Sequence, residues 1–133
     1  MKKFVKILKY SEEFQKKEIL NKMVEQADGD EDLLQLVLER ETHSPTYIGH
    51  FTAIPHLISP KIKSDHYILF LLDHKVQWGE KQMDRVSSIL LLFSSDREKI
   101  KHFMSKVALV LLKKPRGEPF SGSDLEELMN EEK

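Results

Sequence analysis

The sequence predicts an α/β sandwich, in which one β-sheet is covered by helices on both faces. Two stretches, residues 66–73 and 86–93, are almost continuously apolar, as expected of strands that are buried on both sides. Helical patterns precede and follow the strands, in the overall order β-α-α-β-β-β-α-α, so helices are available to cover each face. The 133 residues suit a single domain of this kind.

The first part of the chain predicts one strand and two helices. Residues 4–8 form the expected strand, and Ser11 is the expected N-cap of the first helix because two glutamates follow it. Gly29 is expected to end that helix. A second helix is expected over residues 31–41, with Arg40 in its last turn, where the helix dipole favours a cation.

A proline-bounded arm follows the second helix. Residues 47–54 are rich in β-branched and aromatic side chains and are expected to be extended. Pro55 cannot donate a hydrogen bond to a neighbouring strand, so strand pairing is expected to stop there. His56 is then expected at a strand end, which is where α/β folds place their sites.

The second half of the chain predicts the sheet and the remaining helices. Strands are expected over residues 66–73, 76–78 and 86–93, with a turn at residues 73–75. Ser95 is the expected first residue of a capping box that opens the longest helix, and Pro115 ends it. Ser123 is expected to open the final helix in the same way, and the acidic end of that helix is expected to fray.

The composition excludes several classes of function. The chain has no cysteine, which rules out disulfides, thiol catalysis and cysteine-based zinc sites and is typical of a reducing cytoplasm. The net charge of −1 gives no overall attraction to nucleic acid or acidic membranes. The apolar runs are too short to cross a bilayer, and the basic N-terminus lacks the features of a signal peptide. We therefore expect a cytoplasmic protein that neither binds nucleic acid directly nor inserts into a membrane.

Common cofactor motifs are missing from the sequence. It has no glycine-rich phosphate-binding loop and no G-x-S-x-G elbow. None of the histidines forms an H-E-x-x-H or H-x-H pair; they are His43, His50, His56, His66, His74 and His102. We therefore expect no cofactor and no metal site.

His56 is the candidate reactive residue. Pro55 stiffens its placement, and Arg40, His50 and several hydroxyl groups lie within the preceding 16 residues. A neutral imidazole is a competent nucleophile towards phosphorus, and a guanidinium with nearby hydroxyls is the environment that a phosphoryl group requires. Residue chemistry alone leaves this interpretation and a packed, hydrogen-bonded His56 equally open.

Three motifs resemble a known family. L-E-R-E (38–41), P-T-Y-I-G (45–49) and A-I-P-H (53–56) resemble the mannitol/fructose class, or type 2, of enzyme IIA domains in the bacterial phosphoenolpyruvate-dependent sugar phosphotransferase system. The resemblance covers nearly the whole chain. It implies a three-layer α/β/α sandwich with a mixed β-sheet, formed as one domain by residues 1–133. It also implies a phosphohistidine carrier rather than a free-standing metabolic enzyme.

The resemblance also implies roles for individual residues. His56 matches the histidine that accepts a phosphoryl group from the histidine phosphocarrier protein, and Arg40 matches an arginine that holds the phosphoryl oxygens. We expect the hydroxyls of Thr46 and Thr52 to complete the binding site. In transport proteins of this family, the group then passes to a IIB domain and on to sugar.

The chain departs from the family pattern at a second histidine. Transport-type members often carry one where the last long helix begins, and Ile100 occupies that position here. His102 is two residues further on and is expected to point away from the apolar face. In an extended arm, His50 and His56 share parity and face the same side. The sequence leaves open whether His50 partly replaces the missing histidine or is an exposed rim residue.

A longer stretch resembles a narrower branch of the family. Residues 76–81 (V-Q-W-G-E-K) and 84–93 are similar to IIA-like domains at the C-terminal end of transcription activators and antiterminators that contain phosphotransferase regulation domains (PRDs). In that branch, the phosphate is a regulatory signal for sugar operons, and the chain is one domain of a longer regulator or a free-standing relative. The alternatives are a transport-type enzyme IIA, and a binding module that carries no phosphate.

Overall fold

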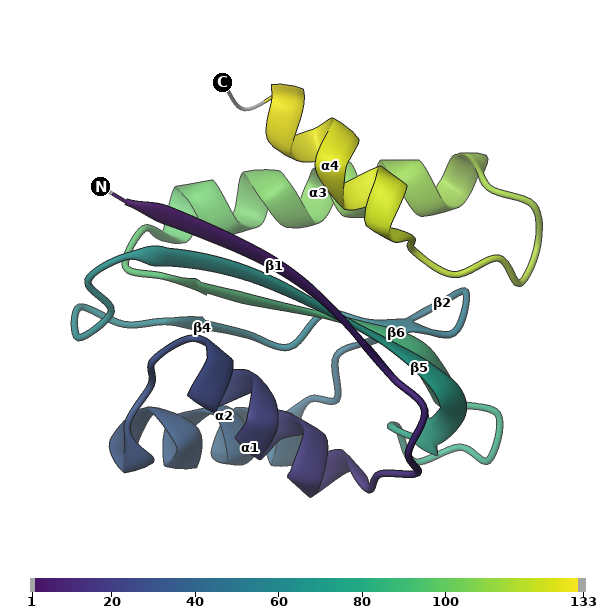
Figure 1. Ribbon diagram of the computed structural model, residues 1–133, viewed down its shortest axis with the longest axis horizontal. Coiled ribbons are helices and arrows are strands. Elements are labelled where there is room, and N and C mark those ends of the chain that lie inside the picture. Colours follow the sequence, from purple (N-terminus) through teal and green to yellow (C-terminus); the bar gives the residue numbers. More distant parts are fainter. Residues whose placement is uncertain (1, 132–133) are drawn as a thin grey trace.

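The computed structural model describes residues 2–131 and has three layers (Figure 1). A twisted sheet separates α1 and α2 on one face from α3 and α4 on the other. The strands are β1 (Lys3–Tyr10), β2 (Tyr47–Gly49), β3 (Thr52–Ala53), β4 (His56–Ile58), β5 (Asp65–Gln77) and β6 (Arg85–Ser94). The helices are α1 (Lys16–Gln26), α2 (Glu31–His43), α3 (Arg97–Lys113) and α4 (Gly122–Glu131). None of the helices is long and apolar enough to span a bilayer within the part of the chain described.

The sheet is mixed, with strand order β1-β5-β6-β3-β2 and with β4 also paired to β6. β5 and β6 form a long antiparallel pair at its centre. β1 runs parallel to β5, and β3 and β4 run parallel to β6. The predicted α/β/α sandwich with a mixed sheet is therefore confirmed.

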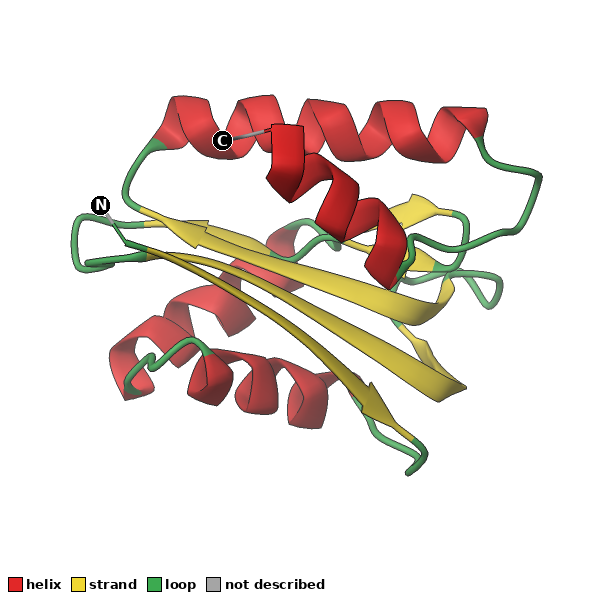
Figure 2. Ribbon diagram, turned by 45° about the horizontal axis from the view of Figure 1, so that its top comes forward, coloured by secondary structure: helices red, strands yellow, loops and turns green. Residues whose placement is uncertain are grey.

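Alternate residues of the central strands belong to two separate cores. Ile68 and Phe70 of β5 pack with α1 and α2, whereas Tyr67 and Leu69 pack with α3 and α4. Figure 2 shows the two helical layers on opposite sides of the strands. Because both faces are covered, the middle segments of these strands, residues 67–72 and 89–93, are apolar at every position rather than at every second one.

The start of α1 differs from the prediction. The helix begins at Lys16, with Gln15 as N-cap and with a hydrogen bond from the Gln15 backbone N–H to the Glu18 carboxylate. Ser11 is not the cap, because β1 continues to Tyr10 and pairs with Leu72 of β5 at that point. The chain needs residues 11–14 to leave the sheet before a helix can lie on its face.

Two other caps lie at neighbouring residues. Asp96, not Ser95, caps α3 and accepts a hydrogen bond from the Lys99 backbone N–H at 3.1 Å. At α4, Ser121 and Asp124 exchange side-chain-to-backbone hydrogen bonds, so the capping box starts two residues before the predicted Ser123. Both segments offer several Ser and Asp residues, and pattern alone does not choose among them. The frayed end predicted for α4 includes residues 132–133, which lie outside the described residues.

The predicted turn at residues 73–75 is wrong. β5 continues through it with a bulge, and pairing with β6 resumes where Val76 faces Val86. The chain reverses further on, where the backbone N–H groups of Trp78 and Gly79 both donate to the Asp84 carbonyl. A Cβ at residue 79 would lie 2.4 Å from an Asp84 carboxylate oxygen, so this turn requires glycine.

The arm before His56 is also not one extended segment. β2 and β3 pair in antiparallel fashion around a tight turn, in which Gly49, His50 and Phe51 all have positive φ angles. Strand pairing does not end before His56 either, because His56 is the first residue of β4 and faces Leu92 of β6. The β-branched and aromatic residues predicted an extended chain here, but they did not reveal that the chain turns back between β2 and β3.

The core on the α3 face provides a test of the fold. Phe103 is 1% exposed and its ring packs edge-on against Tyr67, with 4.8 Å between ring centroids. We expect Phe103→Ala to lower the free energy of unfolding by about 3–5 kcal/mol, because it leaves a cavity. Leu112→Ala on the same helix is the control, since Leu112 is 77% exposed and its loss should change stability by less than about 0.5 kcal/mol. Urea unfolding followed by circular dichroism measures both; equal losses would contradict the assigned core.

Candidate functional site

His56 lies at the edge of the sheet, at the first position of β4. The Pro55 carbonyl accepts a hydrogen bond from the Leu92 backbone N–H at 3.0 Å, so the proline takes part in pairing as an acceptor. Leu57 points into the core beneath α2, and the alternation of a strand turns His56 the other way, where it remains half-buried. The imidazole is thus held by the sheet but remains accessible.

The two ring nitrogens of His56 have different partners. Nδ1 lies 2.9 Å from the Ile54 carbonyl oxygen, which can only accept, so Nδ1 carries the proton. Nε2 lies 2.8 Å from a terminal nitrogen of Arg40, which can only donate, so Nε2 carries a lone pair. This tautomer leaves Nε2 as the nucleophilic atom.

Arg40 reaches His56 from the last turn of α2. Its side chain is exposed, and its backbone carbonyl accepts from the Ser44 N–H at 3.0 Å where the helix ends. A shallow pocket of about 400 Å³ adjoins it, lined by Leu36, Glu39, Arg40, His43, Ser44 and Leu57. A planar guanidinium beside a nucleophilic nitrogen suits an incoming anion with several oxygens.

The surroundings of His56 keep it neutral. Burial lowers the pKa of His56 below its ordinary value of 6.5, and the Arg40 charge lowers this pKa further. The Ile54 carbonyl and the Glu41 carboxylate act in the opposite direction without reversing the result. A lowered pKa means that the imidazole is largely deprotonated at pH 7 and available as a nucleophile.

Thr46 lies near the site, but its hydroxyl points inward. It donates to the Glu41 carboxylate and accepts from the indole N–H of Trp78 at 3.3 Å. The Thr46 backbone N–H also donates to Glu41, at 3.3 Å. The hydroxyl is therefore occupied within the protein, and this placement does not support the predicted direct contact with a phosphoryl group.

Thr52 is completely buried. Its hydroxyl donates to the His50 carbonyl at 2.8 Å and accepts from the Phe120 backbone N–H at 3.1 Å. These bonds join the β2–β3 turn to the segment before α4. Thr52 thus stabilises the fold around the arm, and its position does not support a contact with a ligand at His56.

His50 lies at the tip of the β2–β3 turn, away from His56. Thr52 faces Ser88 and His56 faces Leu92, a separation of four residues or about 13 Å along β6. His50 precedes Thr52, and its Nδ1 lies 3.2 Å from the Glu118 carbonyl. The parity argument fails because the intervening backbone is not extended: His50 has a φ of +51°.

No second histidine joins His56 within the described residues. Ile100 is buried in the α3 core, and His102 is exposed, as its predicted phase requires. Across residues 2–131, the side chain of His56 hydrogen-bonds to Ile54 and Arg40 and not to another histidine. No group of three or more metal-binding side chains occurs in the same range.

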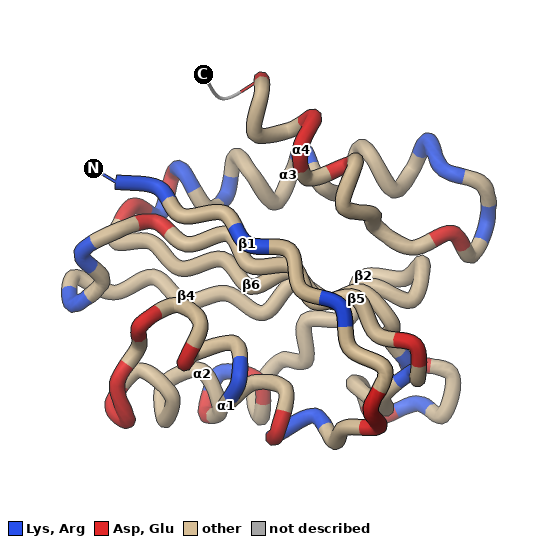
Figure 3. The backbone as a smooth tube through the Cα atoms, in the orientation of Figure 1, with Lys and Arg blue, Asp and Glu red and all other residues tan. Residues whose placement is uncertain are grey.

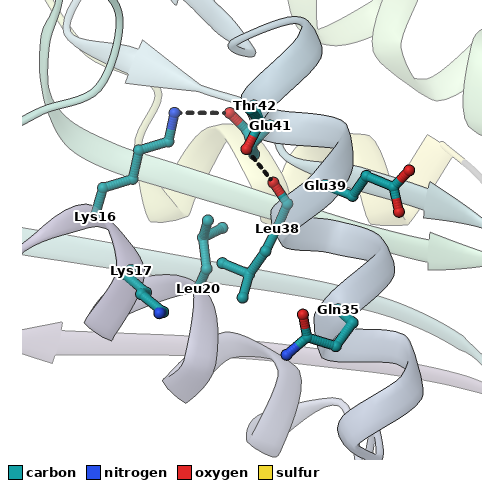
Figure 4. A pocket seen from close by; sticks show the side chains of 8 residues that line it. All are labelled: Lys16, Lys17, Leu20, Gln35, Leu38, Glu39, Glu41 and Thr42. Atoms are coloured by element: carbon teal, nitrogen blue, oxygen red, sulfur yellow. Dashed lines mark hydrogen bonds and ion pairs between the residues drawn. The ribbon is translucent and has the colours of Figure 1, made fainter.

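Sequence reasoning missed Glu41. It is 5% exposed and forms an ion pair with Lys16, 3.0 Å between Nζ and Oε2, which is drawn in Figure 4. A signal was present in the sequence, because Leu33, Val37 and Glu41 follow one another at four-residue steps on the buried stripe of α2. A carboxylate that continues an apolar stripe must find partners inside the protein.

Comparison with known proteins identifies related chains. A family model described as "Phosphoenolpyruvate-dependent sugar phosphotransferase system, EIIA 2" matches residues 6–130. The probable licABCH operon regulator of Bacillus subtilis (strain 168) is 34% identical over 71 residues, which make up 53% of this chain and only 11% of that regulator.

Two solved structures share the fold. The nitrogen regulatory protein IIA-Ntr of Neisseria meningitidis has a TM-score of 0.68 and 20% identity, covering 82% of this chain and 79% of that one. IIA mannitol of Escherichia coli has a TM-score of 0.64 and 18% identity, covering 91% of this chain and 94% of that one. The family model and the shared fold together confirm the resemblance to type 2 enzyme IIA domains that the sequence motifs indicated.

The contact between Arg40 and His56 predicts a change in titration. We expect the His56 ring to titrate below pH 6.5 in the native protein, and Arg40→Gln to move that midpoint upward because it removes a nearby positive charge. Arg116→Gln, at an exposed loop position, is the control and should leave the midpoint in place. NMR titration of the imidazole resonances measures all three proteins. A midpoint that falls in Arg40→Gln would contradict the geometry.

Proposed function

Because the chain belongs to the EIIA type 2 family of the phosphoenolpyruvate-dependent sugar phosphotransferase system, we propose that it accepts a phosphoryl group on Nε2 of His56. The observation that carries this proposal is the arrangement of the ring. Nδ1 is bound to the Ile54 carbonyl, and Nε2 faces the Arg40 guanidinium at 2.8 Å. Nδ1 is thereby fixed as a hydrogen-bond donor, and Nε2 keeps the lone pair that can attack phosphorus.

The proposed step breaks one N–P bond and forms another. The lone pair of Nε2 attacks phosphorus in line with the N–P bond of the donor's phosphohistidine, and the electrons of that bond return to the donor ring. The Nδ1 proton stays on His56, where the Ile54 carbonyl stabilises the charge that the ring gains. No proton has to leave the acceptor, so catalysis depends on position and charge.

Arg40 has two roles in this step. In the resting structure it donates to the Nε2 lone pair, so the guanidinium has to move aside before attack. Its exposed side chain is free to rotate towards the phosphoryl oxygens, where its charge offsets theirs. Arg40 therefore masks the nucleophile at rest and binds the transferred group during reaction.

The donor fitting this chemistry is the histidine phosphocarrier protein, because the reaction needs an existing phosphohistidine. Such a partner would approach the open edge beside β4 and the end of α2. The neighbouring pocket offers apolar contacts through Leu36 and Leu57. With the N–P bond already activated in the donor, the step itself requires no nucleotide.

A regulatory use of the phosphate is favoured over relay to sugar. The chain is similar to a segment of an operon regulator, and the family resemblance assigns the buried Ile100 to the position where transport-type members carry a second histidine. We propose that phosphorylated His56 acts as a signal in transcription control, within a longer PRD-containing regulator or with such a regulator as partner. The second candidate is a transport-type enzyme IIA, favoured by the similarity of fold to IIA mannitol.

The phosphoryl-acceptor assignment is tested by reconstitution. With enzyme I, the histidine phosphocarrier protein and phosphoenolpyruvate, we expect one acid-labile phosphate per chain, detected by mass spectrometry. His56→Ala should abolish it, and Arg40→Gln should slow its formation by about 10²-fold, since one charge-stabilising group is lost. His102→Ala, which changes an exposed histidine on α3, is the control. Equal labelling of native protein and His56→Ala, or no labelling of either, contradicts the assignment.

Transfer onward separates the two candidate functions. The phosphorylated protein is purified and mixed with IIB domains of the mannitol and fructose type. A regulatory protein should retain its phosphate over the time in which a transport-type enzyme IIA, run in parallel, discharges completely. Rapid discharge to a IIB domain would favour the transport assignment.

A further inference from the structure

The buried carboxylate of Glu41 is the centre of a closed group of side chains. Glu41 forms an ion pair with Lys16 of α1 and accepts hydrogen bonds from the backbone N–H and hydroxyl of Thr46. Figure 4 shows the Lys16 ammonium directed at the Glu41 carboxylate at one end of a pocket between α1 and α2. These contacts supply both carboxylate oxygens with partners.

Trp78 closes the group from the other side. Its backbone carbonyl accepts from Lys16 at 2.8 Å, and its indole N–H donates to the Thr46 hydroxyl at 3.3 Å. The Lys16 ammonium also lies 4.8 Å from the centre of the indole ring. Four segments are thereby joined: α1, the end of α2, the arm before β2 and the turn between β5 and β6.

One chain of contacts runs from Glu41 to Arg40. The two residues are adjacent in the last turns of α2, about 100° apart around the helix, so that one side chain is held inside while the other reaches outward. Because an ion pair with Lys16 and two hydrogen bonds from Thr46 hold the Glu41 carboxylate, the helix end has little freedom to rotate or shift. The position from which Arg40 reaches Nε2 of His56 depends on that anchor.

A second chain of contacts runs from Glu41 to His56. Thr46, bound to Glu41, accepts a hydrogen bond at its carbonyl from the Ile54 N–H at 3.0 Å. The Ile54 carbonyl in turn accepts from Nδ1 of His56 at 2.9 Å. The group that fixes the orientation of the ring is therefore tied to the same carboxylate as the helix that carries Arg40.

We propose that Glu41 is a positioning residue of the phosphoryl-acceptor site, which holds Arg40 and His56 in mutual alignment through Thr46, with Lys16 and Trp78 completing the anchor. This inference rests on the proposed function for its kinetic consequence, but not for its structural one. Lys16 has a further role, because it balances the charge of Glu41. Without it, an unpaired buried carboxylate would oppose the arrival of an anionic phosphoryl group.

The kinetic test compares two glutamines on the same helix. Glu41→Gln keeps the size of the side chain and loses the charge that pairs with Lys16. Glu31→Gln makes the same charge change at the opposite end of α2, at an exposed side chain. With saturating phosphorylated phosphocarrier protein, we expect Glu41→Gln to lower the first-order transfer rate at least about tenfold, as misalignment does, with half-saturation unchanged within about twofold. Glu31→Gln should transfer at the native rate.

A second pair of variants separates positioning from folding. Thr46→Val removes the hydroxyl that joins Glu41 to Trp78 and should slow transfer in the same way, whereas Thr46→Ser retains a hydroxyl and should restore most of the rate. Rates are expressed per folded protein, with the folded fraction taken from circular dichroism. Native rates per folded molecule in both Glu41→Gln and Thr46→Val would overturn the proposal.

An NMR measurement tests the anchor without any transfer. In the native protein, the Nδ1 proton of His56 should be observable and protected from exchange, because it is bonded to Ile54. We expect its exchange to be accelerated at least about tenfold in Glu41→Gln and unchanged in Glu31→Gln. If the native protein accepts no phosphate, the proposed function fails, and this measurement still decides the anchor: equal protection in both variants overturns it.

Discussion

The hydrogen bond from Nδ1 of His56 to the Ile54 carbonyl is the interaction on which the site depends. It is a local bond across two residues, made possible because Pro55 holds the chain extended between them. It fixes the proton on one nitrogen and leaves a lone pair on the other. Every other feature of the site, from the Arg40 contact to the lowered pKa of His56, acts on a ring whose tautomer is already set.

The sheet explains why this ring and Arg40 meet. β4 is paired on one side only, to β6, and α2 packs over the core beneath Leu57, so the helix end lies beside the open edge. An imidazole in the middle of the sheet would be covered by helices, and one on a loop would lack a fixed orientation. The edge position combines a rigid backbone with room for a partner protein. Charged residues do not favour one face of the molecule: Figure 3 shows acidic and basic residues spread over both helical layers.

The sequence was most informative where periodicity and family motifs agreed. The two buried strands, the apolar face of α3 and the inward residues of α4 occupy the predicted positions, because burial on one or both faces leaves a direct pattern. His56 and Arg40 were selected from chemistry and motif, and the structure brings them into contact. Helix starts were less predictable, since Ser11, Ser95 and Ser123 are all good caps and tertiary connections decide which residue is used.

The arm before His56 differs from the extended conformation expected of it, and the difference has a physical cause. The residue types in the arm predicted an extended chain. The direction of the chain depends on its backbone angles, and the positive φ angles of Gly49, His50 and Phe51 make it reverse. That reversal sends His50 away from His56 and buries Thr52. The sequence also indicates that a hydroxyl lies near a site, but not which group it bonds. Thr46 was expected to face a ligand, whereas its hydroxyl donates to Glu41.

The contacts of His56 and the anchoring proposed for Arg40 are connected. Arg40 is the cation in direct contact with His56, and no histidine shares that contact within the described residues. A site with one flexible cation tolerates little error in where that side chain starts. In the proposed mechanism, the buried ion pair of Glu41 with Lys16 restricts the backbone of the helix end, while the guanidinium stays free to move from Nε2 to the phosphoryl oxygens. On this proposal, rigidity is placed at Glu41 and mobility at Arg40, one residue apart and about 100° around the same helix.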